Sequence, residues 1–177
     1  MSPFCYLAIF TLALASAAAG DGSYVAGPPK FVTPRQLFLE AHNAARAAAG
    51  VPPLSWNATL ALDAQRYLNE LHSRCNTRPL VAWGTDGVYG RNLFKGHGMG
   101  SGADEAVASW VGEGRWYDNR GGECTAPEGE TCVHYTQVVW RATTQVGCRR
   151  RLCSRGEDTV AVCEYYPPGN VKGQRPY

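Results

Sequence analysis

The sequence predicts an α+β fold. Apolar residues recur at helical spacing in three segments, which begin near residues 34, 58 and 104. Two alternating runs, residues 145–153 and 159–166, follow with a polar turn between them, a pattern typical of a β-hairpin. Because the helices precede the strands, this class is favoured over a regular βαβ repeat.

Residues 1–19 have the pattern of a secretory signal peptide. They contain no charged residue, are mostly apolar and end in three alanines before Gly20. They lack a basic amino-terminal region, and the alternative, a membrane anchor, needs about 20 unbroken apolar residues. We expect removal of this segment, then a flexible leader over residues 20–33 and one domain over residues 34–177. No other segment is long and apolar enough to span a bilayer.

Cysteine content agrees with export. Of seven cysteines, one lies in the signal segment, which leaves an even six. Three disulfides are favoured over a metal site, because no CxxC pair is present and the compartment is oxidising. The net charge of +2 is small and the basic residues are scattered, which argues against nucleic acid as a partner.

The first helix has clear start and stop signals. Thr33, Pro34 and Gln36 form a capping-box pattern, and Gly50 ends the helix. The helical period predicts one apolar face, made of Leu37, Ala41, Ala44, Ala45 and Ala48.

Polar residues in and after this helix have structural interpretations. His42 and Asn43 are expected to be buried hydrogen-bonding residues, since buried polar groups usually have partners. Asn57 is both a possible cap of the second helix and the acceptor of an N-glycosylation sequon, and the two roles compete for one side chain.

The middle of the chain is less regular. Residues 76–102 hold many glycines and predict a long loop. The third helix begins near Asp104 with Trp110 on its apolar stripe, and Glu113 lies beside that stripe. Residues 118–132 are rich in turn-forming residues.

Several motifs together resemble one family. They are Ala-His-Asn-Ala-Ala-Arg at 41–46, Gly-x-Asn-Leu at 90–93, Ser-Trp-Val at 109–111, His-Tyr-Thr-Gln-Val-Val-Trp at 134–140, Gly-Cys at 147–148, Pro-Gly-Asn at 168–170 and Gln-Arg-Pro-Tyr at 174–177. The chain from about residue 34 to residue 177 resembles the plant pathogenesis-related group-one proteins. These belong to the CAP superfamily, together with cysteine-rich secretory proteins and insect venom antigens.

The resemblance implies a three-layer α-β-α sandwich with a central antiparallel sheet and a short helical turn over residues 136–140. It also implies a secreted protein of the apoplast or cell wall. The implied disulfides are Cys75–Cys153, Cys124–Cys132 and Cys148–Cys163.

Family members typically gather two histidines and two glutamates in a cleft, which binds zinc or magnesium in some of them. His134 and Glu113 match this cluster, but Arg91 stands where the family has glutamate, and the second histidine is replaced near Ala82 or Trp83. Two donors are too few for a zinc site, and Arg91 adds a permanent cation. We therefore expect no metal and no cofactor, and hypothesise that Arg91 pairs with Glu113.

Binding of a sterol or related lipid is the function that the resemblance favours. Trp83, Tyr89 and Phe94 are the candidate ligand-contacting residues, because large rings in a glycine-rich loop have less core to enter. The alternative is a hydrolase with His134 as general base and Glu113 as orienting acid. That reaction needs a nucleophile near the imidazole, and none is obvious, so we expect no enzyme activity.

A second alternative concerns the tail, residues 167–177, which resembles a releasable defence-signalling peptide of this family. The junction is altered, since Glu164 replaces an asparagine. The bond before Pro167 resists most proteases, so release would need a dedicated protease as partner. Without the resemblance, these residues predict an extended tail that could pack over the sheet.

Overall fold

Helix α1 (Pro34–Ala48) begins as the sequence predicts. The computed structural model describes residues 31–71, 87–98, 102–153 and 158–177, and one compact unit spans Val32–Tyr177. The Thr33 hydroxyl accepts a hydrogen bond from Gln36 N at 3.3 Å, and Gln36 Oε1 accepts one from Thr33 N at 2.9 Å, which completes the capping box. Gly50, just beyond the helix, has a left-handed φ of 67°.

The buried face of α1 differs from the predicted face. Its buried residues are Phe38, His42 and Arg46, spaced four apart, whereas Ala44 and Ala48 are exposed. The prediction was wrong for these two alanines because it ranked residues by hydrophobicity alone. A histidine and an arginine whose polar atoms have partners can occupy a core-facing stripe, and alanine has little apolar area to bury.

Three further helices follow: α2 (Ala58–Leu71), α3 (Ala103–Gly112) and α4 (Val133–Val138), with a 3₁₀ turn, η1 (Glu113–Trp116), directly after α3. Asn57 caps α2, because its Oδ1 accepts hydrogen bonds from Thr59 N at 2.8 Å and Leu60 N at 3.3 Å. The short helical turn implied for residues 136–140 is confirmed as α4, which starts three residues earlier. No helix in the described ranges is long and apolar enough to cross a membrane.

The sheet contains the predicted hairpin. Strands β5 (Gln145–Leu152) and β6 (Asp158–Tyr166) pair antiparallel at its centre. The full order is β1-β5-β6-β2, in which the two-residue β1 (Ser55–Trp56) pairs parallel with β5 at one edge. The sheet is therefore mixed, although its three long strands are antiparallel. A small second sheet joins β3 (Tyr117–Asp118) to β4 (Glu123–Cys124).

Strand β2 (Gly90–His97) lies within the segment predicted to be a loop. It pairs antiparallel with β6 over its whole length. The loop prediction was wrong here because Gly90 and Gly96 interrupt the alternation of apolar and polar residues. The hydrogen-bonding partner of the segment also lies about seventy residues away in sequence, where local pattern gives no sign of it.

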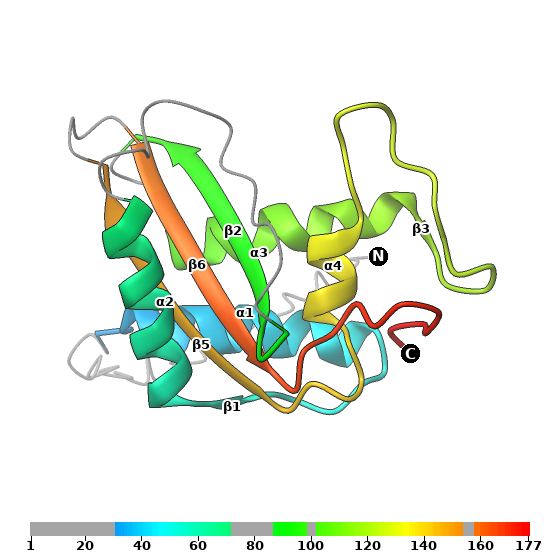
Figure 1. The fold of residues 1–177 in the computed structure, drawn as a ribbon, viewed down its shortest axis with the longest axis horizontal. Coiled ribbons are helices and arrows are strands. Elements are labelled where there is room, and N and C mark those ends of the chain that lie inside the picture. The colour runs from blue at the N-terminus through cyan, green and yellow to red at the C-terminus, as the bar shows by residue number, and fades with distance from the viewer. Residues whose placement is uncertain (1–30, 72–86, 99–101, 154–157) are drawn as a thin grey trace, which may run out of the picture. The chain divides into compact units, whose positions relative to one another are not determined.

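The three layers are clear in Figure 1, where α2 covers one face of the sheet and α1, α3 and α4 lie on the other. Side chains on β6 alternate between the two cores. Val160 and Val162 pack with Ala64 and Leu68 of α2, whereas Ala161, Cys163 and Tyr165 pack with the other helices in the larger core. The expected three-layer α-β-α sandwich is confirmed.

Close contact between α2 and the sheet depends on Gly147. A Cβ built at this position would lie 2.2 Å from Ala61 N and 2.5 Å from Asn57 O, both of them backbone atoms. Only glycine fits so close an approach. The Gly-Cys motif at 147–148 therefore positions the first turn of α2 on β5.

Two of the three expected disulfides are described directly. Cys124 and Cys132 are joined, and Cys148 pairs with Cys163 across the hairpin. Cys153 is also disulfide-bonded. Its expected partner, Cys75, lies outside the described residues.

Candidate functional site

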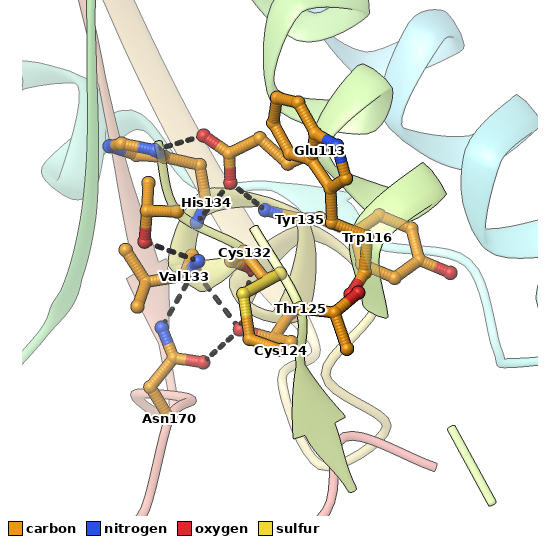
Figure 2. Close-up of a disulfide and its surroundings, with 11 residues drawn as sticks. Glu113, Trp116, Cys124, Thr125, Cys132, Val133, His134, Tyr135 and Asn170 are labelled. Carbon is orange, nitrogen blue, oxygen red and sulfur yellow. Dashed lines mark hydrogen bonds and ion pairs between the residues drawn. A yellow bond between two sulfur atoms is a disulfide. The ribbon is translucent and has the colours of Figure 1, made fainter. Parts of the chain in front are cut away.

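Glu113 and His134 lie in contact, as the sequence predicts. Glu113 is the first residue of η1, directly after α3, and His134 lies in the first turn of α4. Glu113 Oε1 lies 2.6 Å from His134 Nδ1, and Figure 2 shows the carboxylate directed at both the ring and the start of α4. The two side chains form a charge-assisted pair that fixes the orientation of the imidazole.

The same carboxylate caps α4. Glu113 Oε2 accepts hydrogen bonds from His134 N at 2.9 Å and Tyr135 N at 3.1 Å. The first N–H groups of a helix have no partner within the helix, and a negative charge there is favourable. Both oxygens of Glu113 are thus engaged in building the structure around His134.

A disulfide holds the opposite side of this helix start. Cys132 is the residue before α4, and its bond to Cys124 anchors α4 to the turn-rich segment that Figure 2 shows beside Glu113. On the other side, Asn170 donates from Nδ2 to Val133 O at 2.8 Å. The histidine therefore lies on a short helix fixed at three points.

The imidazole of His134 stacks on a core tryptophan. Its ring centroid lies 6.5 Å from that of Trp110, with 19° between the planes. Trp110 is itself fixed, since its Nε1 donates to Leu93 O at 3.1 Å. Asn92 donates from Nδ2 to His134 O at 2.9 Å.

His42 ends a hydrogen-bond chain that reaches the site from α1. Its Nδ1 lies 2.7 Å from Phe38 O and its Nε2 lies 2.8 Å from the Tyr165 hydroxyl. A carbonyl only accepts, so Nδ1 carries the proton and Nε2 accepts from the tyrosine. Asn92 donates to the same hydroxyl at 3.1 Å. Burial lowers the pKa of His42 from 6.5 to about 4, so the ring is neutral at neutral pH.

Arg91 does not pair with Glu113, and that hypothesis was wrong. Its Nε donates to Glu164 Oε1 at 2.6 Å, and its guanidinium lies over the Tyr67 ring at 3.9 Å from the centroid. Arg91 and Glu164 are direct cross-strand partners on β2 and β6. The next residue, Asn92, faces His134, and because neighbouring side chains on a strand point to opposite faces, Arg91 must face α2.

This pairing joins two departures from the family pattern noted in the sequence. The resemblance implies a glutamate at the position of Arg91 and an asparagine at the position of Glu164. The structure places the new cation and the new anion opposite each other, so the charge of each is compensated by the other.

The three candidate ligand-contacting residues are not brought together. Phe94 packs against the core under α1 and α3, whereas Tyr89 lines a surface cleft with residues of α2 on the other side of the sheet. Trp83 lies outside the described residues. The loop interpretation missed this separation because it did not recognise the strand that Phe94 belongs to.

The side chains around His134 supply few donors for a metal ion. The described ranges contain no group of three or more His, Cys, Asp or Glu side chains placed to hold a metal ion. His134 and Glu113 supply two donors, and both oxygens of the glutamate already accept hydrogen bonds. Since zinc takes three or four protein ligands, the described residues do not fit such a site.

Arg46 is a central residue that the sequence interpretation missed. It is fully buried in α1, and it donates to the carbonyls of Pro52 at 2.6 Å and of Val138, Trp140 and Thr143 at 2.9 Å each. Burial lowers its pKa to about 10, which leaves it charged at neutral pH. The spacing of four from His42, itself four from Phe38, was the available signal for this stripe.

The tail packs against α4 and the residues after it, rather than over the sheet. Gly169 N donates to Gln137 Oε1 at 2.9 Å, and the Thr143 hydroxyl donates to Pro167 O at 2.9 Å. Further along, Pro176 is buried, and its carbonyl accepts from Arg141 N at 2.7 Å. The last residue, Tyr177, lies with its hydroxyl 2.9 Å from that of Tyr135, whose pKa is raised by burial and by this contact.

The chain is similar in sequence to a known protein family and to several of its members. The family model described as CAP, the cysteine-rich secretory protein family, matches residues 39–165. Pathogenesis-related protein 1B of Nicotiana tabacum is 46% identical over 143 residues, which cover 81% of this chain and 80% of that protein. Pathogenesis-related protein PR-1 of Medicago truncatula is 39% identical over the full length of both chains.

Solved structures support the fold. Venom allergen-like protein 4 of Schistosoma mansoni superposes with a TM-score of 0.60 and 24% identity, over 83% of this chain and 95% of that chain. The structure of NaASP2 with Zn²⁺ gives a TM-score of 0.59 at 24% identity, over 81% of this chain and 84% of that chain. At this identity the likeness shows the fold alone.

Proposed function

Since the chain belongs to the CAP, or cysteine-rich secretory protein, family and is a relative of the plant pathogenesis-related group-one proteins, we propose that it is a secreted, defence-related protein that acts by binding and not by catalysis. The proposal that the protein does not act by catalysis is supported by the hydrogen bonds of Glu113 and His134. The carboxylate and the imidazole Nδ1 hold the start of α4 together.

Catalysis by this pair would need a nucleophile on the free edge of the imidazole. Within the described part of the chain, no hydroxyl or thiol hydrogen-bonds to His134 Nε2. The single proton of the nearby Thr136 hydroxyl has acceptors at Cys132 O, at Val133 O and at Asn170 Oδ1, the last at 2.6 Å. A hydrolytic activity of the purified protein that disappears in His134→Gln would contradict the proposal.

A sterol or related lipid is the proposed ligand. Val88 is 51% exposed and Tyr166 is 47% exposed, and Tyr89 lies edge-on to Tyr166 with 6.3 Å between centroids. This apolar surface lies next in sequence to the segment that contains Trp83. Exposed apolar groups that adjoin one another are typical of a ligand- or lipid-contacting surface.

The test is titration of a fluorescent sterol with the protein. Trp83→Ala and Tyr89→Ala are expected to weaken binding, whereas Val171→Ala, which removes an exposed apolar side chain from the tail, should leave it unchanged. Absence of binding at micromolar protein would remove sterol from consideration, and equal binding by all three variants would remove this surface as the binding site.

A second candidate function is that of a precursor of a signalling peptide, residues 167–177. The exposure of both Tyr166 and Pro167 favours it, since a protease can reach the bond between them. Mass spectrometry of apoplastic fluid tests it: a peptide that begins at Pro167 is the expected product. Detection only of chains in which the bond between Tyr166 and Pro167 is uncut would contradict this role.

A further inference from the structure

A polar cleft lies on the α2 side of the sheet, on the opposite face from His134 and Glu113. It has a volume of about 640 Å³, within the range of roughly 300–1,000 Å³ that is common for small-molecule sites. One face of α2 and the segment entering β2 line it, with Thr59, Asp63, Arg66, Tyr67, Glu70, Val88, Tyr89 and Arg91. Glu113 and His134 are not among the residues that line this cleft.

Arg91 forms a prearranged donor at this cleft. Its Nε is held by Glu164, which is fully buried, and its guanidinium plane rests on Tyr67. In the described ranges, its two terminal nitrogens make no hydrogen bond. A guanidinium fixed on two sides loses little conformational entropy when its remaining N–H groups bind a ligand.

The charges along the cleft cancel. Arg66 and Arg91 are balanced by Asp63 and Glu70, and Asp63 already pairs with Arg66. Glu164 further compensates Arg91 from behind. The lining residues therefore carry no net charge, and with Glu164 behind them the total is −1, which disfavours an anionic ligand.

Two tyrosines add apolar faces to this polar lining. Tyr67 belongs to α2 and Tyr89 to the segment entering β2, and both line the cleft. A tyrosine combines a flat apolar surface with a hydroxyl that hydrogen-bonds. A ligand that suits such a lining has one apolar ring face and many hydroxyl groups at its edge.

We propose that this cleft binds a neutral oligosaccharide. The apolar face of a sugar ring packs on tyrosine, the terminal nitrogens of Arg91 donate to ring or hydroxyl oxygens, and the carboxylate of Glu70 accepts from hydroxyl groups. The cleft shares Val88 and Tyr89 with the surface proposed for sterol. The sugar proposal is distinguished by Arg91 and Glu70, which the sterol proposal does not use.

Calorimetric titration with neutral hexasaccharides of glucose and of N-acetylglucosamine tests the proposal. The protein should carry no glycan at Asn57, verified by intact mass, because Thr59 of that sequon lines the cleft. Arg91→Lys keeps the charge opposite Glu164 but loses the planar fork, and we expect binding at least about tenfold weaker, as for a lost charged hydrogen bond.

The matched control is Arg115→Lys. Arg115 also lies over an aromatic ring, with its guanidinium 4.0 Å from the Trp116 centroid, but it is not among the cleft-lining residues. The Arg115→Lys variant should bind sugar as the wild type does.

If Arg91→Lys fails to fold, Glu70→Ala tests the proposal instead. Glu70 is exposed at the rim of the cleft, and its loss should weaken sugar binding.

The proposal is overturned if no neutral hexasaccharide binds, if both arginine variants bind alike, or if an oligogalacturonate binds more tightly than every neutral sugar. Sterol titration of the same samples separates the two proposals. If the protein binds sterol but no sugar, the oligosaccharide proposal is wrong and the sterol proposal stands.

Discussion

His42 is a neutral imidazole in the core, and this makes the stability of the protein depend on pH. Its pKa falls from 6.5 to about 4 because burial disfavours the charged form. Above pH 6.5 neither the folded nor the unfolded chain binds this proton. Between that pH and about 4, the unfolded chain binds a proton that the native ring lacks, so the free energy of unfolding falls as the pH falls.

From this shift we expect His42 to account for a loss of about 2.5 kcal/mol between pH 7.5 and pH 4.5. Urea unfolding at the two pH values measures it. His42→Gln should remove most of this difference. An unchanged dependence in His42→Gln would show that other groups dominate.

Arg46 gives a second prediction for a single residue. Arg46→Met is close in volume but leaves four carbonyls without their donor, and three of these hydrogen bonds are buried. We expect a loss of about 3–5 kcal/mol in the free energy of unfolding, measured by urea titration. Arg141→Met is the control, because the guanidinium of Arg141 is exposed and makes one long contact of 3.5 Å; a comparable loss in both variants would contradict the role given to Arg46.

At the level of elements, α4 depends on a carboxylate that precedes it in sequence by twenty residues. Glu113→Gln keeps the shape of the side chain but removes the charge at the helix start and its pairing with His134. We expect a loss of about 1–2 kcal/mol and faster hydrogen exchange at the amides of His134 and Tyr135. Glu130→Gln, at an exposed acid nearby, should change neither quantity. If Glu113→Gln speeds hydrogen exchange only at amides other than those of His134 and Tyr135, Glu113 does not cap α4.

The elements that could be predicted are those whose signals are local. The capping box of α1 lies within four residues, and the two strands of the β5–β6 hairpin are close neighbours in sequence. Strand β2 could not be found, because its partner is distant in sequence and glycines interrupt its pattern. The error about Arg91 followed directly: in a loop the side chain could have reached Glu113, but in a strand the alternation of side chains turns it toward Tyr67.

At the level of the whole molecule, the tail is part of the domain. Its contacts with Gln137, Thr143 and Arg141 satisfy polar groups of α4 and of the segment that follows it, and Pro176 is buried. A chain that ends at Tyr166 should therefore lose about 3–5 kcal/mol, since several buried polar groups lose their partners together. Thermal unfolding measures this loss.

The proposed peptide release supplies a control for that prediction. A chain cut after Tyr166 but still carrying residues 167–177 should retain the peptide on size-exclusion chromatography, because the same contacts persist. Immediate loss of the peptide at neutral pH would show that these contacts contribute little to stability. Cleavage and release are thus separate events, and the second can be slow.

Arg46 also determines when the domain can form during synthesis. It belongs to α1, near the amino-terminal end of the described residues, yet three of its four acceptors lie in residues 138–143. A nascent chain with only its amino-terminal half exposed holds a charged side chain that no core can yet accept. Early collapse around α1 is therefore unfavourable, and the growing chain stays open until most of its length is available.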